Sequence, residues 1–293
     1  MLRMLRRVLV AVIGLCSTLP WVPPAVAAPV TVVATIFPLA DMVAQIGAEH
    51  VAVTTLLPPG ASPHTFEPTP AQIREVAGAQ VFVRIGAGLD AWAAKILAAH
   101  TGNIVVATVT DGLQLLGSGD DAGGDPHVWL DPVLVRDHVV GSIVNALRQA
   151  DPADAAAFDR GAAAFRTALS DLDAEIVHTL APVTDREYVA FHSAWRYFGG
   201  RYGLHEVAAI EPFPGKEPSA REIAAVIEKA RAAHARVILI EPQFDPRLAQ
   251  QIAHEFGGRV LSVDPLGGPA VAGRNTYIDL MRYDARAFAE AAR

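Results

Sequence analysis

The chain has 293 residues, of which 52% are hydrophobic and 19% are charged, and its formal net charge is −7. An acidic protein repels nucleic acid and anionic membrane surfaces, so neither is expected as a partner. A metal cation or a neutral solute is a better electrostatic match. The length is sufficient for one large domain or for two lobes with separate cores.

The first 27 residues have the pattern of a secretory signal peptide, which predicts export to the periplasm. Three arginines precede the apolar run 8–15, and the small residues 25–27 provide a cleavage site. Removing residues 1–27 takes away those three arginines and no acidic residue, so the formal net charge falls from −7 to −10. A permanent membrane helix is disfavoured because the apolar run is short and prolines interrupt the segment after it.

Cys16 is the single cysteine of the chain, and it lies inside the predicted signal peptide. A lipid anchor at Cys16 is the weaker interpretation, because Leu15 is bulky where a lipoprotein signal has a small residue. With Cys16 removed, the mature protein has no disulfide and no thiolate ligand. Any metal site must therefore consist of nitrogen and oxygen donors.

The first half of the chain alternates between strand and helix patterns. Strands are expected at 30–37, 51–57, 81–85 and 104–109, and helices at 38–46, 70–77, 90–99 and from 132 to about 149. Thr69 followed by Pro70 is typical of a helix cap with proline at the first helical position. Such alternation predicts parallel βαβ units with helices on both faces of a sheet.

One unusually long helical pattern, residues 153–180, separates the two halves. Its apolar residues fall on one face: Phe158, Ala162, Phe165, Leu169, Leu172 and Ile176. At ~1.5 Å per residue this helix would extend roughly 40 Å. We interpret it as a strut between two lobes, with an N-terminal lobe at 28–150, the linking helix at 151–182 and a C-terminal lobe at 183–293.

The second half repeats the alternation. Strands are expected at 187–191, 205–210, 236–240 and 259–263, and helices at 193–202, 218–233, 246–256 and 276–292. His192 and Asp264 each come directly after a strand. In open α/β sheets ligands bind at the carboxyl ends of the strands, so both residues are candidates for a binding site.

Four residues are held beside strand ends or in rigid loops rich in proline and aromatic residues: His64, His127, His192 and Asp264. Each has an ordinary alternative, since most histidines are surface or capping residues and an aspartate before proline often starts a turn. Together they supply three imidazoles and one carboxylate, donors that zinc binds tetrahedrally with Zn–N distances of ~2.0–2.1 Å. Two come from each half, which places the expected site in the cleft between the lobes.

The segments around these four residues resemble, in order, the motifs of the zinc and manganese solute-binding proteins of ABC importers. The segments are 63–68 (PHTFEP), 125–132 (DPHVWLDP), 191–198 (FHSAWRYF) and 263–267 (VDPLG). The resemblance implies an α/β fold of two Rossmann-like lobes joined by one long helix, with the four residues as metal ligands. It also implies a monomeric binding protein, not an enzyme, that delivers its ion to a membrane permease and its ATPase.

The third ligand position bears on the choice of metal. Manganese-selective members of the family commonly have a glutamate there, because Mn²⁺ favours oxygen donors whereas imidazole-rich sites suit zinc. His192 therefore predicts high-affinity zinc binding. Manganese, or both ions, remains the alternative, because some relatives with three histidines and one aspartate accept it.

Three acidic residues, Glu67, Asp131 and Glu241, are candidates by motif position for orienting the imidazoles. They are about equally consistent with helix caps or solvated charges.

The loop 117–124 lacks the histidines that many zinc-binding relatives have there, so we expect a single metal site. Whether a zinc chaperone loads the protein stays open, and nothing in the sequence argues for adhesion to host surfaces.

Two other classes of function compete with the importer interpretation. A secreted zinc hydrolase needs an open coordination position and a base, which four protein ligands do not leave. The His-Glu-x-x-His helix of many metalloproteases is also absent from the sequence. A receptor for an organic solute would require a roomy polar or aromatic cleft between the lobes.

Overall fold

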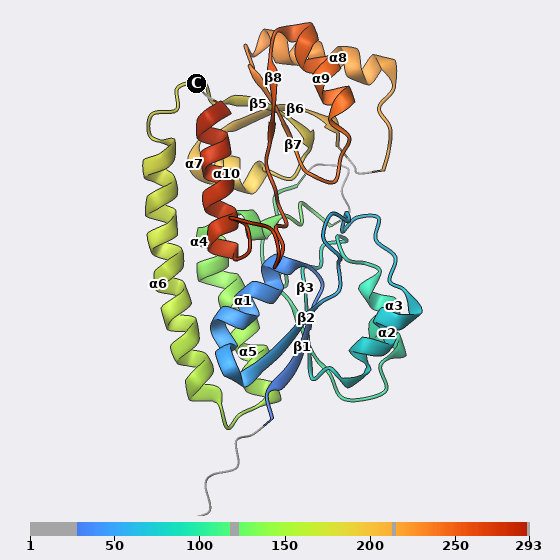
Figure 1. Cartoon of the computed structure of the whole chain (residues 1–293), viewed down its shortest axis with the longest axis vertical. Helices are drawn as coiled ribbons and strands as arrows, with labels where there is room; N and C mark the ends of the chain where they lie inside the picture. Colours follow the sequence, from blue (N-terminus) through green and yellow to red (C-terminus); the bar gives the residue numbers. More distant parts are fainter. Residues whose placement is uncertain (1–27, 118–122, 213–214, 292–293) are drawn as a thin grey trace, which may run out of the picture.

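The computed structural model describes residues 28–117, 123–212 and 215–291, which form two α/β halves (Figure 1). The predicted signal peptide and most of the loop 117–124 lie outside the described residues. Within the described ranges, no helix is both long enough and apolar enough to cross a membrane.

Four parallel strands form the sheet of the N-terminal half, in the order β2-β1-β3-β4. The strands are β1 (Val30–Ala34), β2 (Val51–Thr55), β3 (Val81–Arg84) and β4 (Val105–Thr108). The helices are α1 (Phe37–Gly47), α2 (Pro70–Glu75), α3 (Ala93–Ala99), α4 (Pro132–Leu134) and α5 (Val140–Ala150). Thr69 caps α2 as predicted, accepting a hydrogen bond from the Gln72 amide while Gln72 accepts one from the Thr69 amide.

The C-terminal half has the same topology, with the parallel order β6-β5-β7-β8. Its strands are β5 (Glu187–His192), β6 (His205–Glu211), β7 (Val237–Ile240) and β8 (Arg259–Ser262). Its helices are α7 (Arg196–Tyr202), α8 (Ala220–Ala232), α9 (Pro246–Phe256) and α10 (Tyr277–Ala291). The predicted fold class, two parallel sheets flanked by helices with a long helix between them, is confirmed.

The predicted long helix is α6 (Ala155–Leu180), and it packs against α1 and α5 of the first half and α10 of the second. Figure 1 shows it running along the side of both halves. All six apolar residues of the predicted face are buried. The hydrophobic cluster on this face continues from β1 to α10, so α6 is packed along its length instead of bridging a gap. The proposed division of the chain at residues 150 and 182 stays a prediction.

Helix α7 begins three residues later than predicted, at Arg196 instead of Ser193. The Ala194 amide donates to the His192 carbonyl at 2.9 Å, so a tight turn separates β5 from α7. This turn leaves His192 as the last residue of β5, at the carboxyl edge of the sheet.

Leu172 is fully buried at the middle of α6, whereas Val177 on the same helix is 55% exposed. We expect Leu172→Ala to lower the free energy of unfolding by about 2–5 kcal/mol, because it leaves a cavity in the shared core. The matched control, Val177→Ala, should cost less than about 0.5 kcal/mol. Denaturant unfolding followed by circular dichroism measures both, and equal effects would show that α6 is not part of the core.

Candidate metal site

Three of the four predicted ligands come together in the structure. His64 lies in the proline-rich loop after β2, His127 precedes the short turn Val128–Leu130, and His192 ends β5. Their ligand nitrogens all lie within 4.8 Å of one another. His64 Nε2 and His127 Nε2 are 3.3 Å apart, and the His192 ring centroid is 4.9 Å from each of the other two.

The imidazoles sit in a desolvated environment. His127 and His192 are each 4% exposed, and His64 is intermediate. Burial, together with the smaller effect of the charges of the other two histidines, lowers the pKa of His64 to about 2. Burial is also the main cause that lowers the pKa of His127, against the opposing effect of Asp125. These two rings are therefore neutral at physiological pH, the form that a metal requires.

Asp125 orients the ring of His127. Its Oδ1 lies 2.8 Å from His127 Nδ1 and accepts the His127 backbone amide at 3.0 Å. An acceptor at Nδ1 places the proton there and leaves Nε2, which faces His64, free to donate its lone pair to a metal. Sequence reasoning missed this role, although the Asp-x-His spacing of the motif was a usable signal.

Of the three predicted orienting acids, Glu241 alone lies beside an imidazole: Glu241 Oε2 is 3.5 Å from His192 Nδ1, and Glu241 is 1% exposed. Glu67 matches the alternative of a solvated charge, because its largely exposed carboxylate pairs with Lys95 at 2.8 Å. Asp131 instead caps α4 through the amides of Val133 and Leu134.

Asp131 also pairs with Arg201 of α7 at 2.8 Å, so it holds the two halves together. Asp131 therefore matches the alternative of a helix cap that the sequence left open. A carboxylate at a motif position can serve as a cap or an ion-pair partner without touching the metal site.

Asp264, the predicted fourth ligand, is buried and lies after β8 as expected, but its carboxylate does not belong to the histidine cluster. Its Oδ1 accepts the amides of Leu266 at 3.0 Å and Gly267 at 2.9 Å. Its Oδ2 accepts a hydrogen bond from Arg274 Nη1 at 2.8 Å. A hydrogen bond links the segment that carries Asp264 to the histidine region: the Trp129 indole donates to the Pro265 carbonyl at 2.7 Å.

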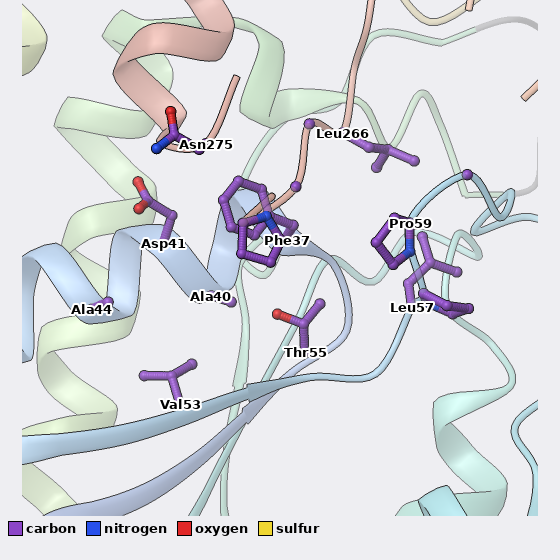
Figure 2. A pocket seen from close by; sticks show the side chains of 15 residues that line it. Phe37, Ala40, Asp41, Ala44, Val53, Thr55, Leu57, Pro59, Leu266 and Asn275 are labelled. Carbon is purple, nitrogen blue, oxygen red and sulfur yellow. The ribbon is translucent and has the colours of Figure 1, made fainter. Parts of the chain in front are cut away.

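A separate cavity of about 530 Å³ lies next to this segment, between α1, β2 and residues 266–275 (Figure 2). Asp41 is the one ionisable residue among the described residues that line it, and its carboxylate accepts the Tyr277 amide at 2.8 Å. Burial raises the pKa of Asp41. None of the three histidines lines this cavity, so the metal-ligand cluster and this cavity are distinct.

Two parallel α/β halves held along one long helix, with a cluster of three imidazoles between them, define a metal-binding solute-binding protein of an ABC importer. The chain belongs to the ZnuA family, the periplasmic component A of the zinc-uptake complex, with a match over residues 32–291. This family consists of non-enzymatic metal-binding transport proteins, so the prediction that the chain is not an enzyme is confirmed.

The similar proteins include one named for zinc uptake and one named for manganese binding. The high-affinity zinc uptake system protein ZnuA of Bacillus subtilis (strain 168) is 26% identical over 268 residues, 86% of this chain and 84% of that protein. The manganese-binding lipoprotein MntA of Halalkalibacterium halodurans is 29% identical over 257 residues, 85% of this chain and 84% of that protein. A crystal structure of ZnuA is similar with a TM-score of 0.81 and 30% identity, covering 90% of this chain and 100% of that one.

The orienting contact between Asp125 and His127 can be tested by substitution. Asp125→Asn keeps the size of the side chain but removes the charge that fixes the His127 ring, so we expect the affinity for zinc to fall about 10–100-fold. Competition with a chromophoric chelator measures this change. Asp171→Asn, on the exposed side of α6, is the matched control and should leave the affinity unchanged. An equal affinity for the Asp125 variant and the control would exclude the orienting role.

Proposed function

We propose that this protein captures Zn²⁺ outside the cytoplasm and delivers it to the membrane permease of an ABC importer. The observation that carries the proposal is the cluster of three imidazole nitrogens within 4.8 Å of one another. Imidazole donors in this number suit zinc, which takes nitrogen ligands in tetrahedral sites. Burial adds to the fit, because neutral rings bind a metal without first losing a proton.

The donor atoms favour zinc over manganese. Manganese prefers carboxylate, carbonyl and water oxygens, and all three clustered groups here are nitrogen donors. Manganese, or both ions, is the second candidate, supported by the similarity to MntA of Halalkalibacterium halodurans. The two candidates differ in how strongly binding depends on an oxygen donor beside the three imidazoles.

Asp264 is the proposed fourth ligand of the site. It lies at the carboxyl end of β8, in the half that also provides His192, and residues next to it contact the segment that carries His127. Ligation by Asp264 requires its Oδ2 to be shared with, or released by, Arg274. The complete proposed set is therefore His64, His127, His192 and Asp264.

The remaining parts of the proposal come from the family and the sequence. Export depends on the predicted signal peptide, residues 1–27, and the mature chain acts as a monomer. Its partners are a permease with its ATPase in the inner membrane, and the transported zinc ion is cargo. The acidic mature chain attracts cations electrostatically, which raises the rate of capture.

A competition titration tests the choice of metal. Metal-stripped mature protein should bind one zinc ion per molecule, counted by elemental analysis, and an excess of manganese should not displace it. His192→Ala should lower the zinc affinity by at least about 100-fold, because a three-nitrogen site loses a direct ligand. His254→Ala, an exposed histidine on α9, is the matched control and should bind zinc normally.

The outcomes separate the candidates. Preferential binding of manganese would retain the family and transport role but defeat the zinc assignment. A second tightly bound ion would contradict the expected single site. Binding of neither ion would overturn the proposed metal site itself.

A further inference from the structure

Arg274 is the residue that binds the carboxylate of Asp264. Its Nη1 lies 2.8 Å from Asp264 Oδ2, its guanidinium lies 4.6 Å from the centroid of the Tyr283 ring, and its side chain is 22% exposed. A cation–π contact with the ring and one charge-assisted hydrogen bond hold the guanidinium beside Asp264. No motif of the sequence analysis included this arginine.

We propose that Arg274 is a specificity-determining residue: it competes with the bound metal ion for Asp264, and so favours zinc over manganese. This inference rests on the proposed function, because it concerns the fourth ligand of the same site. Arg274 touches the predicted ligand and not the histidine cluster, so it acts through Asp264.

The competition centres on one oxygen atom. Asp264 Oδ1 is held by the amides of Leu266 and Gly267, in a turn where Gly267 has a φ of 62°. That backbone conformation favours glycine, and a Cβ there would lie 2.5 Å from the Arg274 carbonyl oxygen. The turn therefore fixes Oδ1 and leaves Oδ2 as the oxygen for a further partner, and Arg274 occupies it.

A guanidinium on Oδ2 weakens this oxygen as a metal ligand in two ways. It neutralises part of the carboxylate charge, and its own positive charge repels a divalent cation. Ions that need the oxygen donor are affected most. Zinc depends mainly on the three imidazoles and tolerates a weakened carboxylate, whereas manganese has little affinity for a site without strong oxygen donors.

The surroundings allow Asp264 and Arg274 to separate. The guanidinium makes one hydrogen bond to Asp264 and not a bidentate pair, and the buried Arg274 Nε has no partner in the described part of the protein. Asp284 Oδ1 accepts the Asp264 amide at 2.7 Å, while its buried Oδ2 lacks a partner among the described residues. A second carboxylate therefore lies beside the pair. Residues 266–268 also border the cavity of Figure 2, which gives the segment room to move.

Measurement of zinc and manganese affinities for Arg274→Gln tests the inference. The variant should bind manganese at least about 10-fold more tightly, while its zinc affinity changes by less than about threefold, so the ratio of the two affinities falls. Arg282→Gln on α10, which removes an exposed ion pair with Glu175, is the matched control and should leave the ratio unchanged. Circular dichroism and thermal unfolding verify that each variant is folded.

Two further variants show whether the effect passes through Asp264. The double variant Arg274→Gln with Asp264→Asn should lose the gain in manganese affinity. Asp264→Asn alone should lower the zinc affinity far less than His192→Ala does, and this comparison tests the inference even if Arg274→Gln does not fold. Cobalt absorption spectra give an independent readout, because the d–d bands should change in Arg274→Gln and not in Arg282→Gln.

The inference and the proposed function fail in different ways. A folded Arg274→Gln protein with an unchanged affinity ratio overturns the role of Arg274 while metal binding stands. If Asp264→Asn lowers the zinc affinity as much as His192→Ala does, the role of Arg274 is overturned as well, because Asp264 would then be a full ligand despite Arg274. Unchanged zinc binding in His192→Ala, or no metal binding by the original protein, overturns the proposed function.

Discussion

Trp129 connects the two halves of the molecule at the histidine cluster. Its indole is 1% exposed and donates to the Pro265 carbonyl at 2.7 Å, and its own carbonyl accepts the Tyr277 hydroxyl at 2.7 Å. The Trp129 ring also lies 5.2 Å from that of His127, centroid to centroid. Leaving any of these buried polar groups without its partner would cost about 1–3 kcal/mol. The placement of His127 relative to the Asp264 segment depends on this residue.

The same connection limits how the halves can move. Their cores merge along α6 and α10 into one hydrophobic cluster, so opening the halves like two free lobes would expose apolar surface. Tyr197 adds hydrogen bonds across the junction, to the Asp125 carbonyl and from the Leu116 amide. We therefore expect the ion to enter and leave through local rearrangement of loops at the site rather than through a large hinge motion.

Much of this architecture could be predicted from the sequence because it depends on local periodicity. The apolar face of α6 and the strand that ends at His192 are set by patterns within one element, and both were found. The acids that orient the imidazoles were harder to predict, because the position of a residue in a motif does not tell which way its side chain points. Glu67 turned out to pair with Lys95, whereas Asp125 contacts His127. The link between Arg274 and Asp264 depends on a turn and on packing against α10, so no local pattern indicated it.

The charges around the histidine cluster explain why a divalent cation fits it better than a neutral solute. Asp125 and Glu241 each place a carboxylate beside an imidazole, and both are almost completely buried. In the described part of the chain no lysine or arginine pairs with Glu241, and Arg196 reaches Asp125 only at 4.0 Å. Buried carboxylates without a close cation are costly, and a neutral solute would leave that cost in place. A divalent cation among the three rings offsets that cost, because each carboxylate contacts an imidazole that would bind the ion.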